Sequence, residues 1–75
     1  MLKLKYSDLK NMALVSDLYV SVKRVEGGWS VYVDIPHQQG VLVVKNSGEI
    51  KVYSTFNTIL KHFEDLGIKN FRYVG

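Results

Sequence analysis

The sequence predicts an α+β domain in which an amphipathic helix covers one face of a largely antiparallel sheet. Three observations carry this prediction. Four segments between residues 18 and 53 have the alternation or apolar density of strands, residues 56–66 have the period of a helix, and residues 71–74 are typical of a closing strand. Because the chain has 75 residues, it has room for one core, and we expect residues 1–75 to form a single small domain.

The first two strands are predicted over residues 18–25 and 29–35. Apolar side chains alternate with polar ones in both segments and would form one buried face: Leu18, Val20, Val22, Trp29, Val31, Val33 and Ile35. Gly27 and Gly28 lie between the segments and can supply the positive φ that a tight turn requires. We therefore expect an antiparallel hairpin with one face open to water.

Two further strands, over residues 41–45 and 49–53, would complete a four-stranded antiparallel meander. The run from Val41 to Val44 has no polar face, which favours an interior place in the sheet. In the segment 49–53 the alternation predicts that Ile50 and Val52 point inward.

The links between these strands are predicted as turns. Residues 36–40 hold the only proline and His37, so we interpret them as a turn and leave a binding role for His37 open. Asn46-Ser47-Gly48 is a turn by composition, because Asn and Gly tolerate left-handed backbone geometry.

Residues 56–66 are predicted as a helix packed on the sheet. Five large apolar side chains recur at helical spacing: Phe56, Ile59, Leu60, Phe63 and Leu66. Ser54 or Thr55 can cap the start of this helix, and Gly67 followed by Ile68 can cap its end. The strand at 71–74 would follow by a crossover and run parallel to one neighbour.

The N-terminus has two patterns. Apolar residues at 2, 4 and 6 alternate as in a strand, whereas Ser7 can cap a helix with apolar residues at 9, 12 and 13. We expect a short helix around residues 8–14.

Composition excludes several classes of protein. The chain has no cysteine, so it has neither a disulfide framework nor a thiolate nucleophile. Its start, MLKLKYSDLK, lacks the apolar run of a signal peptide, and no stretch approaches the length of a membrane span. We expect a cytoplasmic protein with no membrane partner. The formal charge of +3 permits an anionic partner but does not require one.

No catalytic constellation is present in the sequence. Gly27-Gly28 leads into a strand, which is the wrong context for a phosphate-binding loop. Asp34-x-x-His37 could be half of a metal site, although an exposed aspartate and a turn histidine explain it more simply. The serines and threonines have local roles in caps and turns and lie in no nucleophile motif. We expect no enzymatic activity, no cofactor or metal, and no small-molecule ligand.

The candidate site is the polar face of the predicted sheet. By alternation, eight side chains point away from the helix: Tyr19, Ser21, Lys23, Ser30, Tyr32, Asp34, Lys51 and Tyr53. Tyrosine-rich surfaces are typical of protein interfaces, and tyrosines beside lysines are typical of sheets that bind nucleic acid. Tyrosine also suits an ordinary half-exposed strand. Asp34 argues mildly against nucleic acid.

We therefore expect a non-enzymatic interaction module. Its candidate surface, Tyr19, Ser21, Lys23, Ser30, Tyr32, Lys51 and Tyr53, would take a protein partner or a second copy of the chain. The alternative is a nucleic-acid-binding domain that uses the same face with Lys23, Lys51 and Arg24.

The final third of the chain, GEIKVYSTFNTILKHFEDLGIKNFRYVG, resembles the tail of small accessory proteins carried on bacterial plasmids and other mobile elements. Those proteins also end in a turn, a short strand, an amphipathic helix that closes on Leu-Gly-Ile, and a last strand. The resemblance implies a bacterial, non-enzymatic protein beside partition, stability or host-defence functions. It assigns no functional residue.

Overall fold

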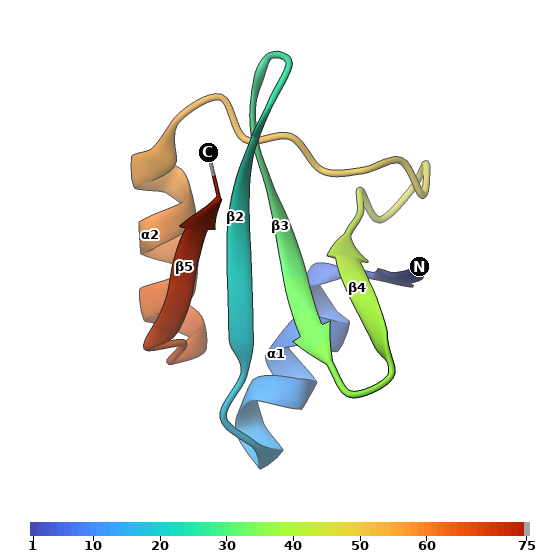
Figure 1. Ribbon diagram of the computed structural model, residues 1–75, viewed down its shortest axis with the longest axis vertical. Coiled ribbons are helices and arrows are strands. Elements are labelled where there is room, and N and C mark those ends of the chain that lie inside the picture. The colour runs from blue at the N-terminus through green and yellow to red at the C-terminus, as the bar shows by residue number, and fades with distance from the viewer. Residues whose placement is uncertain (75) are drawn as a thin grey trace.

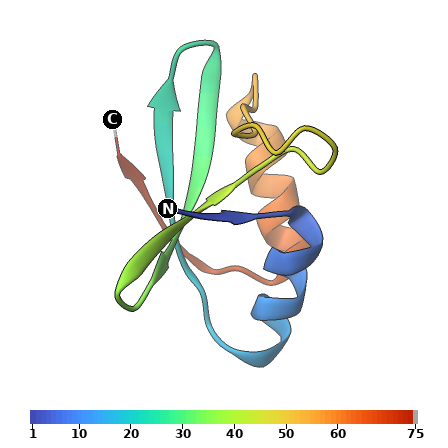
Figure 2. The same cartoon turned by 90° about the vertical axis from the view of Figure 1, so that its right-hand side faces the viewer.

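Five strands form one mixed sheet, and two helices cover one of its faces (Figures 1 and 2). The fold is that of a computed structural model, which describes residues 1–74. In chain order the elements are β1 (Leu2–Leu4), α1 (Tyr6–Val15), β2 (Tyr19–Val25), β3 (Gly28–Ile35), β4 (Gln38–Leu42), α2 (Phe56–Leu66) and β5 (Asn70–Val74). The predicted α+β class is confirmed.

The strands lie in the order β1-β4-β3-β2-β5. The inner three pair antiparallel, as expected for consecutive strands joined by short turns. Both edge strands run parallel to their neighbours, β1 to β4 and β5 to β2. The prediction that the last strand is parallel to a neighbour is therefore confirmed, but the sheet is mixed and is not the predicted meander with one added strand.

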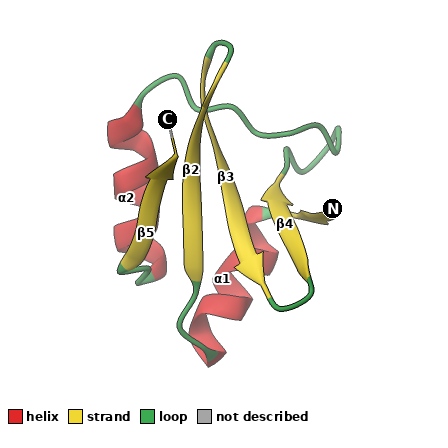
Figure 3. Cartoon of the chain, viewed as in Figure 1, coloured by secondary structure: helices red, strands yellow, loops and turns green. Residues whose placement is uncertain are grey.

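Residues 49–53 do not form the predicted fourth strand of a meander. They make two isolated antiparallel bridges, between Ile50 and Val43 and between Tyr53 and Trp29, before the chain crosses to α2. The edge of β4 that the meander would have used is occupied by β1, where Leu4 lies opposite Leu42. The long link from β4 to α2 is visible as a loop in Figure 3.

The side chains of residues 49–53 also point in the opposite directions to those predicted. Tyr53 is buried, while Ile50 and Val52 are nearly half exposed. The main chain of Trp29 exchanges two hydrogen bonds with that of Tyr53, both of 2.8 Å. This exchange fixes Tyr53 beside the start of β3 and turns its ring towards the helices.

The core lies between the sheet and the two helices. Its buried apolar residues come from every strand but β5 and from both helices: Leu4, Leu9, Val20, Val22, Val31, Val33, Leu42, Tyr53, Ile59, Phe63 and Ile68. The predicted inward faces of the first hairpin and of the 56–66 helix are thus confirmed for the residues in the middle of each element. Each fully buried aliphatic side chain contributes roughly 1.5 to 3 kcal/mol.

The ends of the helices follow simple capping chemistry. Gly67 is left-handed, with φ 74°, and the Ile68 amide donates to the Phe63 carbonyl at 2.9 Å, which confirms the predicted C-terminal cap of α2. Helix α1 begins earlier than predicted, because Lys5 is its N-cap residue in place of Ser7. The Lys5 amide donates to Oδ2 of Asp8 at 2.9 Å. Neither helix of residues 1–74 is long and apolar enough to cross a membrane.

Candidate interaction surface on the open face of the sheet

One face of the sheet carries no helix, because α1 and α2 both lie on the other side (Figure 2). We call this surface the open face. Strand register places ten polar side chains on it: Lys3, Tyr19, Ser21, Lys23, Ser30, Tyr32, Asp34, Gln39, Asn70 and Arg72. Successive side chains of a strand point to opposite faces of the sheet. Because Val20, Val22 and Val33 are buried against the helices, the polar residues between them lie on the open face.

A hydrogen-bonded network joins four strands across the centre of the open face. Nε of Arg72 donates to Oγ of Ser21 at 3.0 Å, and Ser21 donates to Oδ2 of Asp34 at 3.2 Å. The Arg72 guanidinium also lies 3.8 Å from the same carboxylate oxygen. Gln39 donates to Oδ1 of Asp34 at 3.4 Å. The only carboxylate of the ten residues is thus held by three neighbours.

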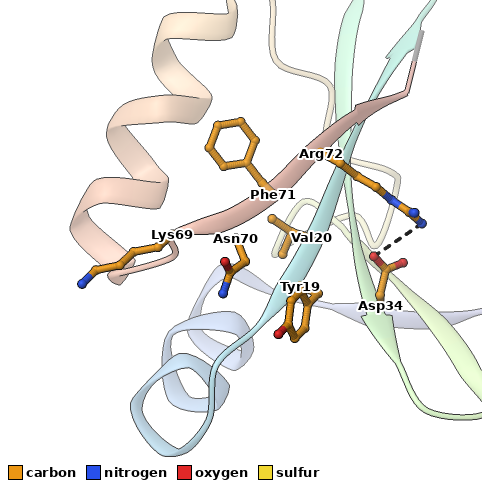
Figure 4. Close-up of a pocket in the computed structure, with 7 residues that line it drawn as sticks. All are labelled: Tyr19, Val20, Asp34, Lys69, Asn70, Phe71 and Arg72. Carbon is orange, nitrogen blue, oxygen red and sulfur yellow. Dashed lines mark ion pairs between the residues drawn. The ribbon is translucent and has the colours of Figure 1, made fainter.

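Two adjacent hollows lie on this face. The Tyr19 hollow, of about 450 Å³, is lined by Tyr19, Val20, Asp34, Lys69, Asn70, Phe71 and Arg72 (Figure 4). The Tyr32 hollow, of about 270 Å³, is lined by Met1, Ser21, Lys23, Tyr32, Gln39, Arg72 and Val74. Arg72 lines both, so a guanidinium lies between two sites that each hold one tyrosine.

Cationic groups outnumber the single carboxylate on the open face. The ammonium of Lys23 lies 6.0 Å from the centre of the Tyr32 ring. Lys3 is on the same face, because it lies opposite Val41, which in turn lies opposite Tyr32. With Arg72 engaged by Asp34, the charges of Lys3 and Lys23 are not balanced by an acid of this face.

Two of the predicted surface residues, Tyr53 and Lys51, do not lie on the open face. Tyr53 is in the core, where its hydroxyl oxygen lies 3.1 Å from Nδ1 of His62. The ammonium of Lys51 lies 5.5 Å from the centre of the Tyr53 ring. Their expected positions are wrong because the segment 49–53 leaves the sheet and passes on the side of the helices.

Two other expected residues are unable to serve on this surface. Ser30 has the predicted orientation but is fully buried, and its hydroxyl has no hydrogen-bond partner. Arg24, which the nucleic-acid alternative used, has its guanidinium 4.9 Å from the centre of the Trp29 ring. Register pairs Arg24 with Trp29, so both lie on the face opposite Lys23.

Sequence reasoning missed Asn70, Arg72, Gln39 and Lys3. The signal for the first two was present, because Phe71 and Tyr73 alternate with Asn70 and Arg72 along β5. Their contribution depends on the position of β5 beside β2, which alternation does not specify. Gln39 lay within a segment that was predicted to be a turn, whereas β4 begins at Gln38.

No metal centre is formed by the described part of the chain. Within residues 1–74, no three side chains among His, Asp and Glu are grouped so that they could hold a metal ion. His37 occupies the turn between β3 and β4, as predicted, with φ 72°.

Comparison with protein-family models, with curated proteins and with solved structures finds no match for this chain. The resemblance of its final third to plasmid accessory proteins therefore stays a prediction.

Proposed function

We propose that this protein is a non-enzymatic interaction module of the cytoplasm whose open face binds single-stranded nucleic acid. One observation carries the proposal. Two hollows lie side by side on the open face, each with a tyrosine, and a guanidinium lies between them. Successive bases of a single strand are joined by one phosphate, so two ring sites with a cation between them match the chemistry of a dinucleotide.

The side chains supply both components that such binding needs. Tyr19 is 61% exposed and Tyr32 is half-buried, so each offers ring surface on which a base can stack. Lys23 lies beside Tyr32, Lys3 lies two strands away on the same face, and both can neutralise phosphates. Asp34, which argued against nucleic acid, is compensated by Arg72, Ser21 and Gln39.

A protein partner is less well supported on this face. Lysine is depleted at the centre of protein interfaces, where aromatic and apolar side chains dominate. The open face instead has lysines beside its tyrosines, and its central apolar residue, Val41, is only 3% exposed. The open face thus lacks the apolar centre that a protein partner would bury.

The sheet edge gives a second candidate, self-association of two copies through β5. All five residues of this strand are exposed, and its outer edge has no neighbouring strand within residues 1–74. A strand without proline or bulge at a sheet edge is a template for pairing with another chain. Light scattering after size exclusion tests this candidate, since a monomer at high micromolar concentration would overturn it.

Fluorescence anisotropy with labelled single-stranded oligonucleotides tests the main proposal. We expect Tyr32→Ser to weaken binding by about 1 to 3 kcal/mol, the cost of losing one stacked base. Lys23→Gln should reduce the slope of log affinity against log salt by about 0.7, the value for one phosphate contact on a single strand. Lys61→Gln is the matched control, because Lys61 is exposed on α2, away from the open face.

The outcomes separate the candidates. Equal losses in the Lys23 and Lys61 variants would indicate nonspecific attraction to a basic protein. An absence of binding at low salt would overturn the nucleic-acid proposal. A concentration-dependent dimer would favour association through β5, whose outer edge has no neighbouring strand within residues 1–74.

A further inference from the structure

We infer that the Tyr19 hollow selects guanine among the bases, an inference that rests on the proposed function. The hollow combines an exposed aromatic ring with a carboxylate, an amide and a guanidinium (Figure 4). Its volume of about 450 Å³ lies within the range of sites that take small ligands. One base with its sugar is a ligand of that class.

The carboxylate of Asp34 is oriented and still has free capacity. Oδ2 accepts from Ser21 and lies near Arg72, while Oδ1 accepts only a long bond of 3.4 Å from Gln39. An ionised carboxylate has about four acceptor positions, so both oxygens can take a further donor. The Asp34 side chain is 33% exposed and lines the hollow, which leaves it accessible to a base edge.

A pair of carboxylate oxygens matches one base edge best. The Watson–Crick edge of guanine presents an N–H and an NH₂ side by side, and these two donors can bond one carboxylate in the same forked way as an arginine does. Adenine and cytosine each place their amino group beside a ring acceptor, and uracil places its N–H between two carbonyls. Those acceptors would face the charge of Asp34 and be repelled.

The remaining groups of the hollow suit the same occupant. Tyr19 and Asn70 lie opposite each other on β2 and β5, so a base stacked on Tyr19 has the Asn70 amide within the same hollow. Arg72 reaches across β2 towards Asp34, while Lys69 points away from the other lining residues (Figure 4). Arg72 thus remains the group that lies between the two hollows and can meet the phosphate.

The test uses fluorescein-labelled uridine nonamers in which the central base is guanine, hypoxanthine, adenine, cytosine or uracil. The guanine probe should bind the unmodified protein about tenfold more tightly than the adenine, cytosine and uracil probes, near the lower end of what one bidentate contact provides. Hypoxanthine lacks the amino group of guanine and should bind several-fold less tightly than guanine. This comparison needs no variant, so it does not depend on whether a substitution folds.

The variant Asp34→Asn then tests whether Asp34 causes the preference for guanine. The change keeps the size of the side chain and removes one acceptor and the charge, so the preference for guanine should fall to less than twofold while affinity for the all-uracil probe stays equal or rises. Asp65→Asn is the control, because Asp65 is exposed on α2, and this variant should keep the tenfold preference.

Three results would overturn the inference, and they differ in what they leave standing. Equal binding of all five probes would remove the guanine selectivity and leave the proposed function intact. A preference that survives Asp34→Asn would place the selectivity outside this hollow. An absence of binding by every probe would overturn both the inference and the proposed function.

Discussion

The phenol oxygen of Tyr53 lies 3.1 Å from Nδ1 of His62, and this contact fixes the end of the long link to helix α2. The imidazole also meets the ring of Tyr6 edge-on, at 5.2 Å between centres. Tyr6 begins α1, Tyr53 lies near the end of the link and His62 lies on α2, so one small aromatic cluster joins three segments. Sheet pairing alone would not hold residues 49–53 in place, because they make only two isolated bridges.

Tyr53→Phe should lower the free energy of unfolding at neutral pH by about 1 kcal/mol, the usual value for one hydrogen bond. The ring stays in the core, so the loss isolates the hydroxyl. Urea unfolding followed by circular dichroism measures it, with Tyr73→Phe as the control, because Tyr73 is 56% exposed on β5. Equal stabilities of the two variants would show that the contact with His62 contributes nothing.

Alkaline pH should weaken the fold through the same hydroxyl. Burial, with a smaller contribution from Tyr6, raises the pKa of Tyr53 above its ordinary value of 10.0. Since the folded state holds this proton more tightly than the unfolded state, the stability it contributes is complete below pH 10 and is lost as pH rises through the folded-state pKa. The free energy of unfolding should therefore fall more steeply above pH 10 in the unmodified protein than in Tyr53→Phe. Parallel curves for the two proteins would contradict this prediction.

The backbone at Gly28 has no room for a side chain. Gly28 has φ 152°, and a Cβ atom there would overlap the carbonyl oxygen of Tyr53. That carbonyl accepts from the Trp29 amide, so it is held by the isolated bridge between Trp29 and Tyr53. Gly28→Ala should destabilise the protein by more than 3 kcal/mol, since it combines a positive φ with a backbone clash.

Gly27→Ala is the matched control for that clash. Gly27 also has a positive φ, 87°, but a Cβ atom at this position would meet nothing within 4 Å. It should cost only about 1 to 2 kcal/mol, the penalty of a left-handed alanine. Thermal unfolding compares the two variants, and equal midpoints would mean that the approach of Tyr53 to Gly28 is not close.

Local periodicity predicted which segments form helices and strands better than it predicted which strands pair with one another. The hairpin, the α2 helix with its glycine cap and the parallel last strand depend on alternation or capping within a few residues, and each was confirmed. Leu2 and Leu4 had the alternation of a strand, but the sequence contained no signal that β1 would pair with β4. Such pairing depends on contacts between residues nearly forty positions apart.

The candidate site was predicted where alternation holds and missed where the chain leaves the sheet. One regular hairpin contains Tyr19, Ser21, Lys23 and Tyr32. The two-residue period of its strands therefore predicted the correct face for these side chains. Residues 49–53 alternate as well as the hairpin does, yet the exchange of hydrogen bonds between Tyr53 and Trp29 inverts them. Alternation identifies two faces, and only tertiary contacts decide which face is inward.

Two serines of the open face should respond oppositely to truncation. Ser30 is fully buried and its hydroxyl has no partner, so Ser30→Ala should raise the free energy of unfolding by about 1 kcal/mol, because an unsatisfied buried hydroxyl costs about 1 to 3 kcal/mol. Ser21 is also buried, but its hydroxyl joins Arg72 to Asp34. Ser21→Ala should therefore lower stability by about 1 to 2 kcal/mol. Equal effects of both changes on urea unfolding would contradict the hydrogen-bond assignment of the open face.

His37 should be replaceable, because its position in the turn between β3 and β4 is set by backbone geometry. It is the only described residue other than glycine with a positive φ, 72°, and it follows Pro36 as the second residue of the two-residue link. A proline followed by a residue of positive φ is the arrangement of a type II turn, which favours glycine or asparagine at this second place. His37→Gly should raise stability by up to about 1 kcal/mol, whereas His37→Val, with a β-branched side chain, should lower it. Thermal unfolding ranks the three proteins. If the glycine variant also keeps its affinity for the oligonucleotides, the histidine serves the turn alone, and a loss of affinity with intact stability would instead make it part of the binding surface.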